Sequence, residues 1–215
     1  KTLLGFIPHN FDHELVETGP GKLNAAMWLA RLLAKAPADL VIGAGTAGSL
    51  ELSLKPGDFL ASAEVLISDW RMEDGATNQV APYGSFNYGP IAENVEKIVI
   101  RSPGSLSQKL LASLGPEFLK GRILSSDAFV SGREHKLNLG NLFGCRICEM
   151  EAGAIAHVAR RSGNPPWLHL RIVADTLDEA LQDYFKMELD MTRILGERVL
   201  RVLTLLDERW EEYNS

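Results

Sequence analysis

The stretch VIGAGTAGSL, residues 41–50, contains a glycine pattern of the form G-x-G-x-x-G directly after a short apolar run. In dinucleotide-binding proteins this pattern opens a helix whose N-terminus faces a pyrophosphate, with an acidic residue about 20 positions further on. Here Asp69 stands at a tolerable distance, but Pro56 and Gly57 would stop such a helix after about two turns. The stretch therefore predicts a strand and a glycine loop that serve another purpose, and we expect no cofactor.

Size and composition indicate one globular domain, residues 1–215. Hydrophobic residues make up 46% of the chain and charged residues 23%, which is close to the average of globular proteins. No stretch rich in Pro, Gly or Ser separates two halves. A chain of this length can bury a sizeable core and fold alone.

The charge pattern favours a small molecule as the partner. The formal net charge is −6, and Lys and Arg are scattered, so the basic footprint of a nucleic-acid-binding protein is missing. No apolar run reaches about 18 residues, and Gly5, Pro8 and His9 interrupt the start of the chain. We therefore expect neither a membrane span nor an ordinary signal peptide, and a cytoplasmic protein.

The two cysteines, Cys145 and Cys148, stand three positions apart. Such a pair is half of a zinc site, but the chain has no second pair and no histidines at ligand-like spacing. We predict buried, reduced, structural thiols on a strand and no metal. The lack of a disulfide framework agrees with a reducing compartment.

Alternating strands and helices predict an α/β fold with a largely mixed or parallel sheet covered on both faces. Short aliphatic runs predict strands at Thr2–Ile7, Glu14–Glu17, Asp39–Ile42, Asp58–Ile67, Lys97–Ile100, Arg122–Leu124, Arg146–Cys148 and Leu168–Val173. Apolar residues at steps of three and four predict helices at Lys22–Lys35, Ser105–Leu114, Ala152–Arg161 and Glu179–Leu206.

Distinctive motifs follow the predicted strands, where an open α/β sheet carries its chemistry. They are TGPGK (18–22), GAGTAG (43–48), SSDAFV (125–130), CEMEA (148–152) and RIVAD (171–175). In this order they resemble the nucleoside phosphorylase and nucleosidase superfamily, most closely the 5′-methylthioadenosine/S-adenosylhomocysteine nucleosidases. The likeness runs from about Thr18 to the end. It implies a single domain with a central mixed sheet flanked by helices, hydrolysis of a purine nucleoside with release of adenine, and a homodimer.

The resemblance gives the glycine stretch a role at the sugar. It implies that Thr46 helps to hold the attacking water or phosphate and that Gly48 lies against the nucleoside. On the residues alone, the favoured interpretation is a tight strand-to-loop turn that uses the backbone freedom of glycine.

Glu151 is a candidate for recognising ribose. A carboxylate accepts hydrogen bonds from two vicinal hydroxyls at once. The resemblance implies this role for Glu151, with Met150 packing on the sugar. The alternative is a Glu favoured by the macrodipole of the helix predicted at Ala152–Arg161, and both can hold.

Asp175 is the catalytic candidate. A purine leaves more easily when an acid protonates N7, and an Asp in that role must stay protonated near neutral pH, which burial favours. Its second oxygen can accept from an exocyclic amino group, which favours adenine. The alternative is an N-cap for the next helix. The resembled family often has a hydroxyl residue where this chain has Ala174, and that hydroxyl supports the catalytic Asp. Ala174 cannot give Asp175 this support.

Three more residues are candidates by their place in these motifs. Phe129 suits stacking on a base, and Val130 offers backbone groups to the adenine edge; on composition alone Phe129 is a core residue. Arg171 either orients the nucleophile or pairs with a carboxylate.

The N-terminal part departs from the resembled family. There, an early Glu activates water, and a helix and a hairpin precede the TGPGK region. Here eleven residues separate Ile7 from Gly19, which predicts a domain abbreviated at its N-terminus. Asp12, His13 and Glu14 are unaligned candidates for the base.

Three other functions stay open at this point. Phosphorolysis on the same fold needs arginines for phosphate, and phosphorylases of this family often have one where this chain has Gly43. Futalosine-type hydrolases tend to have Asn in place of Asp175. A nucleoside-binding protein without catalysis would fit the missing N-terminal carboxylate.

Overall fold

The computed structural model describes residues 12–73, 78–82, 84–177 and 181–214. The strand predicted at Thr2–Ile7 lies outside these residues. The strand predicted at Glu14–Glu17 is wrong, because this described segment is exposed chain with no strand pairing. Leu15 is 46% exposed there, so no apolar face of the segment is buried to favour a strand.

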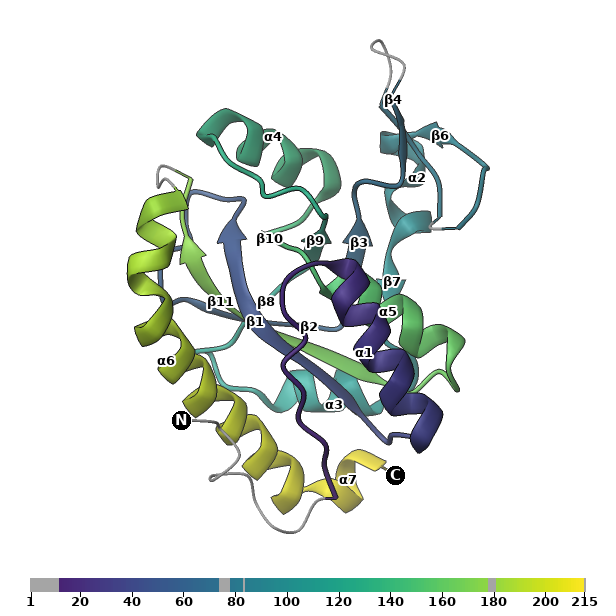
Figure 1. The fold of residues 1–215 in the computed structure, drawn as a ribbon, viewed down its shortest axis with the longest axis vertical. Coiled ribbons are helices and arrows are strands. Elements are labelled where there is room, and N and C mark those ends of the chain that lie inside the picture. Colours follow the sequence, from purple (N-terminus) through teal and green to yellow (C-terminus); the bar gives the residue numbers. More distant parts are fainter. Residues whose placement is uncertain (1–11, 74–77, 83, 178–180, 215) are drawn as a thin grey trace.

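The core of the fold is an eight-stranded mixed sheet (Figure 1). Its strands lie in the order β7-β3-β9-β10-β1-β11-β2-β8. Their bounds are β1 (Val41–Ser49), β2 (Phe59–Ser62), β3 (Glu64–Ile67), β7 (Ile100–Arg101), β8 (Leu119–Lys120), β9 (Ile123–Ser125), β10 (Ile147–Glu149) and β11 (Trp167–Asp175). The sheet contains both parallel and antiparallel pairs, so the predicted mixed sheet in a single α/β domain is confirmed.

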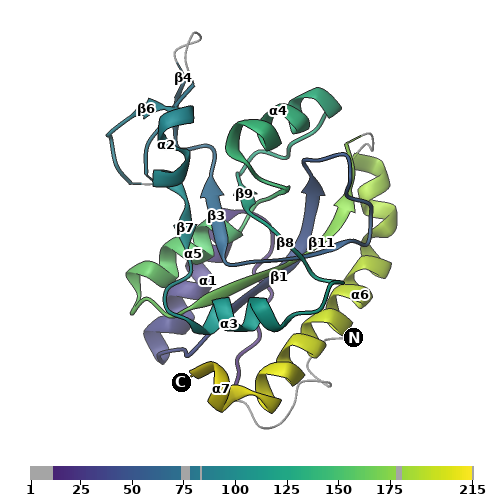
Figure 2. The same ribbon diagram turned by 180° about the vertical axis from the view of Figure 1, so that it is seen from behind.

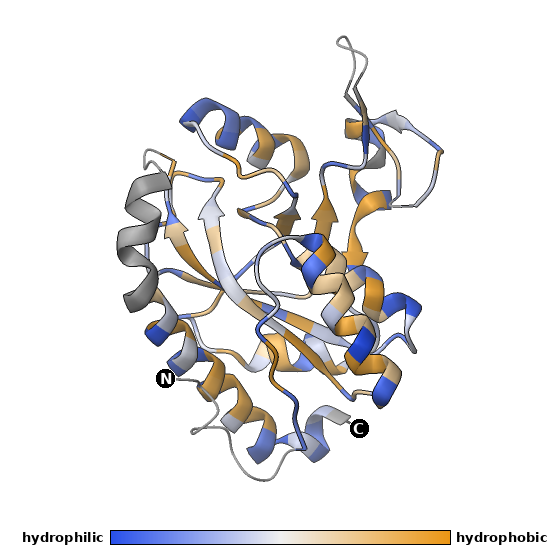
Figure 3. Ribbon diagram, viewed as in Figure 1, coloured by the Kyte–Doolittle hydropathy of each residue, from blue (hydrophilic) through white to orange (hydrophobic). Residues whose placement is uncertain are grey.

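Helices cover both faces of this sheet. One face packs against α1 (Lys22–Lys35) and α5 (Ala152–Arg161). The other packs against α3 (Leu106–Ser113), α6 (Leu181–Glu208) and α7 (Trp210–Asn214), as the two opposite views show (Figures 1 and 2). Alternate residues of β11 pack into the two cores: Val173 faces the core under α1 and α5, and Ile172 faces the core under α3, α6 and α7. Apolar residues run along β3 and β11 (Figure 3).

A third group of elements lies at one end of the sheet, beyond β3 and β9 (Figure 1). It consists of α4 (Arg133–Phe143), α2 (Ile91–Ile98) and a small sheet of β4 (Arg71–Glu73), β5 (Asn78–Val80) and β6 (Gly89–Pro90).

The strand predicted at Lys97–Ile100 is wrong at its start, because Lys97 and Ile98 are the last two residues of α2. Ile91, Val95 and Ile98 recur at helical spacing and pack in one core cluster.

The glycine stretch itself is strand rather than loop. β1 runs through it to Ser49, parallel to β11 over most of its length. A Cβ on Gly43 would lie 2.6 Å from Nδ1 of His169 on β11, so the neighbouring strand leaves no room for a side chain. Asp58–Ile67, predicted as one strand, is divided at Ala63 into β2 and β3, which pair with different neighbours.

Other expectations have mixed outcomes. The predicted bounds of α1 and α5 are confirmed. Cys145 and Cys148 are buried thiols, and burial raises the pKa of each to about 12, as expected for unreactive structural cysteines. Cys148 lies on β10 as predicted, whereas Cys145 precedes this strand, so the predicted strand position is wrong for Cys145. Within the described residues, no helix is long and apolar enough to cross a bilayer. The homodimer and the cytoplasmic location stay predictions.

Candidate active site

Three of the sequence motifs meet at the end of β1. Gly48 pairs with Cys148 of β10 on one side and with Asp175 of β11 on the other. The register shifts between Ala47 and Gly48, which marks a bulge at this point. The ends of RIVAD and CEMEA therefore flank the end of the glycine stretch.

Gly48 is a glycine because Asp175 lies against it. A Cβ at this position would lie 2.9 Å from each carboxylate oxygen of Asp175. The side chain of Asp175 is almost fully buried. The backbone of Gly48 thus forms one wall of the space in which this carboxylate sits.

Asp175 has a partner that the sequence did not suggest. Its Oδ2 accepts a hydrogen bond from Nζ of Lys136, on α4, and the same Nζ donates to the carbonyl of Thr176 at 2.7 Å. Lys136 is only 1% exposed. It shares the buried face of α4 with Leu139 and Phe143, and a lysine at helical spacing on an apolar stripe was the available signal.

Glu151 holds the start of α1. Its Oε1 accepts a hydrogen bond from the backbone N–H of Gly21 at 2.7 Å, so TGPGK lies beside CEMEA. The N-terminus of α5 is capped by a different residue, because Oε2 of Glu149 accepts from the N–H groups of Glu151 at 3.0 Å and Ala152 at 2.8 Å. Burial, and then the charge of Glu149, raise the pKa of Glu151.

Arg171 pairs with Glu149 inside the protein. Its Nη2 donates to Oε2 of Glu149 at 2.7 Å, and both side chains are 1% exposed. Nη1 donates to the carbonyl of Gly43 at 2.8 Å, so the side chain crosses β1 and ties β11 to β10. Of the two interpretations of Arg171, the pairing with a carboxylate is the one seen in this geometry.

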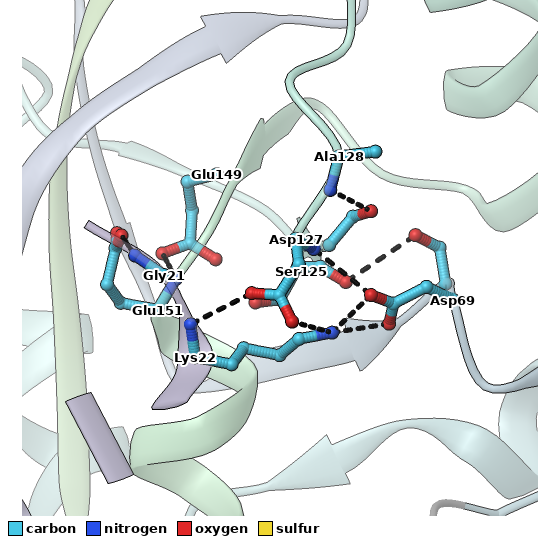
Figure 4. Close-up of polar contacts among 10 residues, drawn as sticks. Gly21, Lys22, Asp69, Ser125, Asp127, Ala128, Glu149 and Glu151 are labelled. Carbon is cyan, nitrogen blue, oxygen red and sulfur yellow. Dashed lines mark hydrogen bonds and ion pairs between the residues drawn. The ribbon is translucent and has the colours of Figure 1, made fainter. Parts of the chain in front are cut away.

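A second polar cluster joins α1 to the ends of β3 and β9 (Figure 4). Nζ of Lys22 forms ion pairs with Asp69 and Asp127. The N–H of Lys22 donates to Asp127 Oδ1 at 2.9 Å, and the N–H of Asp127 donates to Asp69 Oδ2 at 3.0 Å. SSDAFV thereby joins the other motifs.

A comparison with known protein families shows to which family the chain belongs. The family described as the phosphorylase superfamily matches residues 14–206. The chain belongs to the phosphorylase superfamily. The resemblance expected from the strand-end motifs is therefore confirmed, and so is the fold that it implied.

Solved structures of other superfamily members have the same fold. A 5′-methylthioadenosine/S-adenosylhomocysteine nucleosidase from S. pneumoniae, bound to a transition-state inhibitor, is 25% identical with a TM-score of 0.70, over 88% of this chain and 79% of that one. An S-adenosylhomocysteine nucleosidase from Streptococcus pyogenes is 20% identical with a TM-score of 0.72, over 95% and 91%. A futalosine hydrolase from Helicobacter pylori is 24% identical with a TM-score of 0.69, over 87% and 76%.

The remaining candidate residues of this chain lie in or next to the motifs that meet at the end of β1. Thr46 is partly buried on β1, two residues before Gly48, and Met150 is partly buried between β10 and α5. Phe129 and Val130 lie between β9 and α4, where Val130 packs against a core cluster and Phe129 is 45% exposed. The core interpretation of Phe129 is therefore wrong.

The N-terminal candidates for a base lie elsewhere. Glu14 forms an ion pair at 3.1 Å with Lys35, the last residue of α1, and Asp12 and His13 directly precede it. The site lies at the other end of this 14-residue helix, roughly 20 Å away at 1.5 Å per residue. None of the three therefore reaches the end of β1.

We expect Gly48→Ala to displace the Asp175 carboxylate and to lower the rate of a reaction in which Asp175 takes part by about 10²-fold, because small misplacements of a reacting group have effects of this size. The matched control is Gly45→Ala on the same strand, whose Cβ would meet Arg171 at an ordinary 3.7 Å. Initial rates and melting temperatures of both variants check the prediction. Equal rates for the two variants would contradict it.

Proposed function

We propose that the chain hydrolyses the N-glycosidic bond of a purine nucleoside with a thio substituent at the 5′ carbon, 5′-methylthioadenosine or S-adenosylhomocysteine, and releases adenine. The observation that carries the proposal is that the ends of β10 and β11 flank Gly48, with the Asp175 carboxylate against this side-chain-free wall and Glu151 two residues past the end of β10. Similarity to the S. pneumoniae nucleosidase supports the same reaction class.

Glu151 accepts hydrogen bonds from the 2′ and 3′ hydroxyls of the ribose in this proposal. The backbone N–H of Gly21 already donates a hydrogen bond to Oε1, and this bond fixes the orientation of the Glu151 carboxylate. The cap on α5 comes from Glu149, so Glu151 keeps acceptor capacity for the sugar. Met150 packs on the sugar, and Thr46 holds the attacking water.

Asp175 acts on the base. Lys136 binds Oδ2, so Oδ1 is the oxygen that faces the purine in our proposal. Protonation at N7 turns the purine into a good leaving group while positive charge develops on the sugar. Phe129 stacks on the base, and backbone groups of Val130 meet its edge.

The surrounding charges support water over phosphate as the nucleophile. Phosphate binding needs cationic side chains whose charge is not already paired with a carboxylate. Lys22, Lys136 and Arg171 are each held by a carboxylate. An arginine cannot replace Gly43 without displacing His169, because its Cβ alone would lie 2.6 Å from the ring.

The proposal is tested by incubating the protein with 5′-methylthioadenosine, S-adenosylhomocysteine, adenosine, inosine and futalosine, with and without phosphate. Free base and sugar are then identified by chromatography. We expect adenine release from the two thio nucleosides without phosphate. Release only with phosphate would indicate a phosphorylase, and release from futalosine alone a futalosine-type hydrolase. Binding without release would indicate a nucleoside-binding protein.

We expect Glu151→Gln to raise KM strongly, because the amide loses two charge-assisted hydrogen bonds of about 1.5–3 kcal/mol each. The raised pKa of Glu151 predicts a second effect, on the pH dependence of KM. As pH falls, Glu151 gains a proton earlier than an ordinary Glu, so the KM of the unsubstituted protein rises on the acid side. The variant has no such rise. Kinetics between pH 5 and pH 8 test both statements, and an unchanged KM in the variant would remove Glu151 from the sugar site.

A further inference from the structure

The buried ion pair of Lys136 and Asp175 stands in the middle of the proposed site. Both side chains are nearly inaccessible to solvent, 1% and 6% exposed. Nζ of Lys136 donates to Asp175 Oδ2 and to the carbonyl of Thr176, so two of its three N–H groups are used. The lysine comes from α4, an element outside all five strand-end motifs.

This geometry changes where the proton for the leaving base comes from. A carboxylate that accepts a hydrogen bond from an ammonium group is ionised and has no proton to give. The nearest proton is on Nζ of Lys136, within hydrogen-bond distance of the same carboxylate.

We propose that Lys136 and Asp175 act as one proton-donating pair, in which Lys136 supplies the proton that Asp175 delivers to the departing purine. This inference rests on the proposed function. Asp175 is the catalytic residue, because it touches the base. Lys136 acts through it and also fixes which carboxylate oxygen faces the base.

The step balances without any further reactant. The bond between the sugar and the purine nitrogen breaks, and its electron pair goes to the purine. A proton passes from the Lys136 ammonium to Asp175 and from Asp175 to N7, so neutral adenine leaves and Lys136 becomes a neutral amine. Water bonds to the sugar carbon and releases one proton, and Lys136 regains one from solvent.

Strand β10 brings two ionisable side chains near the pair. On β10, the Cys148 thiol lies next to the pair, and burial raises its pKa to about 12. Glu149, the next residue on that strand, is held by Arg171.

The test is the pH dependence of kcat at saturating substrate. In the unsubstituted protein, we expect kcat to stay level between pH 5 and pH 8, because Lys136 supplies the proton. In Lys136→Met this proton source is missing, so the leaving purine depends on protons from solvent and kcat falls as pH rises. We expect the fall between pH 5 and pH 8 to be at least about tenfold.

Lys136→Arg separates proton supply from ion pairing. A guanidinium keeps the positive charge but does not release its proton in proteins. We expect kcat to fall at least about tenfold at every pH while KM changes little. Lys35→Met, which removes an exposed lysine at the far end of α1, is the control and keeps the original profile.

Each outcome has a separate meaning. If the unsubstituted protein releases no base, the proposed function fails and the inference fails with it. If it is active but Lys136→Met has the same pH profile, or Lys136→Arg has full turnover, only the inference is overturned. Should neither variant fold, a fall of turnover between pH 5 and pH 8 in the unsubstituted protein would itself overturn the inference.

Discussion

Asp175→Asn is expected to lower the turnover of 5′-methylthioadenosine by roughly 10²–10⁴-fold, the usual contribution of a general acid. Asn is nearly isosteric and still hydrogen-bonds to the purine, so binding falls much less than turnover. The substitution also removes the partner of buried Lys136, so we expect a lower melting temperature as well. Rates are therefore compared per folded molecule, below the melting transition.

Asp39→Asn provides the control for this variant, because Asp39 is exposed and precedes the other end of β1. It should leave both turnover and melting temperature unchanged. Substrate affinity of the Asp175 variant is measured by calorimetry. Turnover near that of the unsubstituted protein would remove Asp175 from the mechanism, and with it most of the argument for nucleoside cleavage.

Arg171→Met is expected to destabilise the fold by about 3–5 kcal/mol, the typical loss when one partner of a buried ion pair is removed. Glu149 would stay buried without its cation, and the link between β10 and β11 across β1 would be lost. Denaturant unfolding measures the change in free energy.

The double variant Arg171→Met, Glu149→Gln distinguishes pairing from a direct role in the reaction. The double variant also removes the unpaired negative charge of Glu149, so we expect it to recover part of the stability lost in the single variant. If Arg171 oriented the nucleophile instead, stability would change little in the single variant and turnover would collapse. That result would contradict the structural role assigned here.

Local patterns were sufficient for the helices that cover one face of the sheet. The steps of three and four in Lys22–Lys35 and Ala152–Arg161 predicted α1 and α5 with their observed bounds. The strand-end motifs also predicted which segments meet, because the ends of neighbouring strands lie together in an open α/β sheet. The roles of the individual residues in those motifs stay predictions.

The errors come from contacts between distant parts of the chain. Residues 43–48 have the composition of a loop, yet they form a strand whose glycines face His169 and Asp175 of β11, because these two side chains occupy the space where a Cβ on Gly43 or Gly48 would lie. α4 was missed because its sequence is largely polar and contains Gly140. Lys136 was missed with it, although its spacing from Leu139 and Phe143 marked it as buried.

The most direct test is a time course of adenine release from 5′-methylthioadenosine in phosphate-free buffer, with Asp175→Asn at the same concentration of folded protein. The proposed function predicts steady release of adenine together with 5-methylthioribose by the unsubstituted protein, and release slower by roughly 10²–10⁴-fold in the variant. Nucleoside binding without release of adenine by the unsubstituted protein, or equal rates for the two proteins, would contradict the proposal.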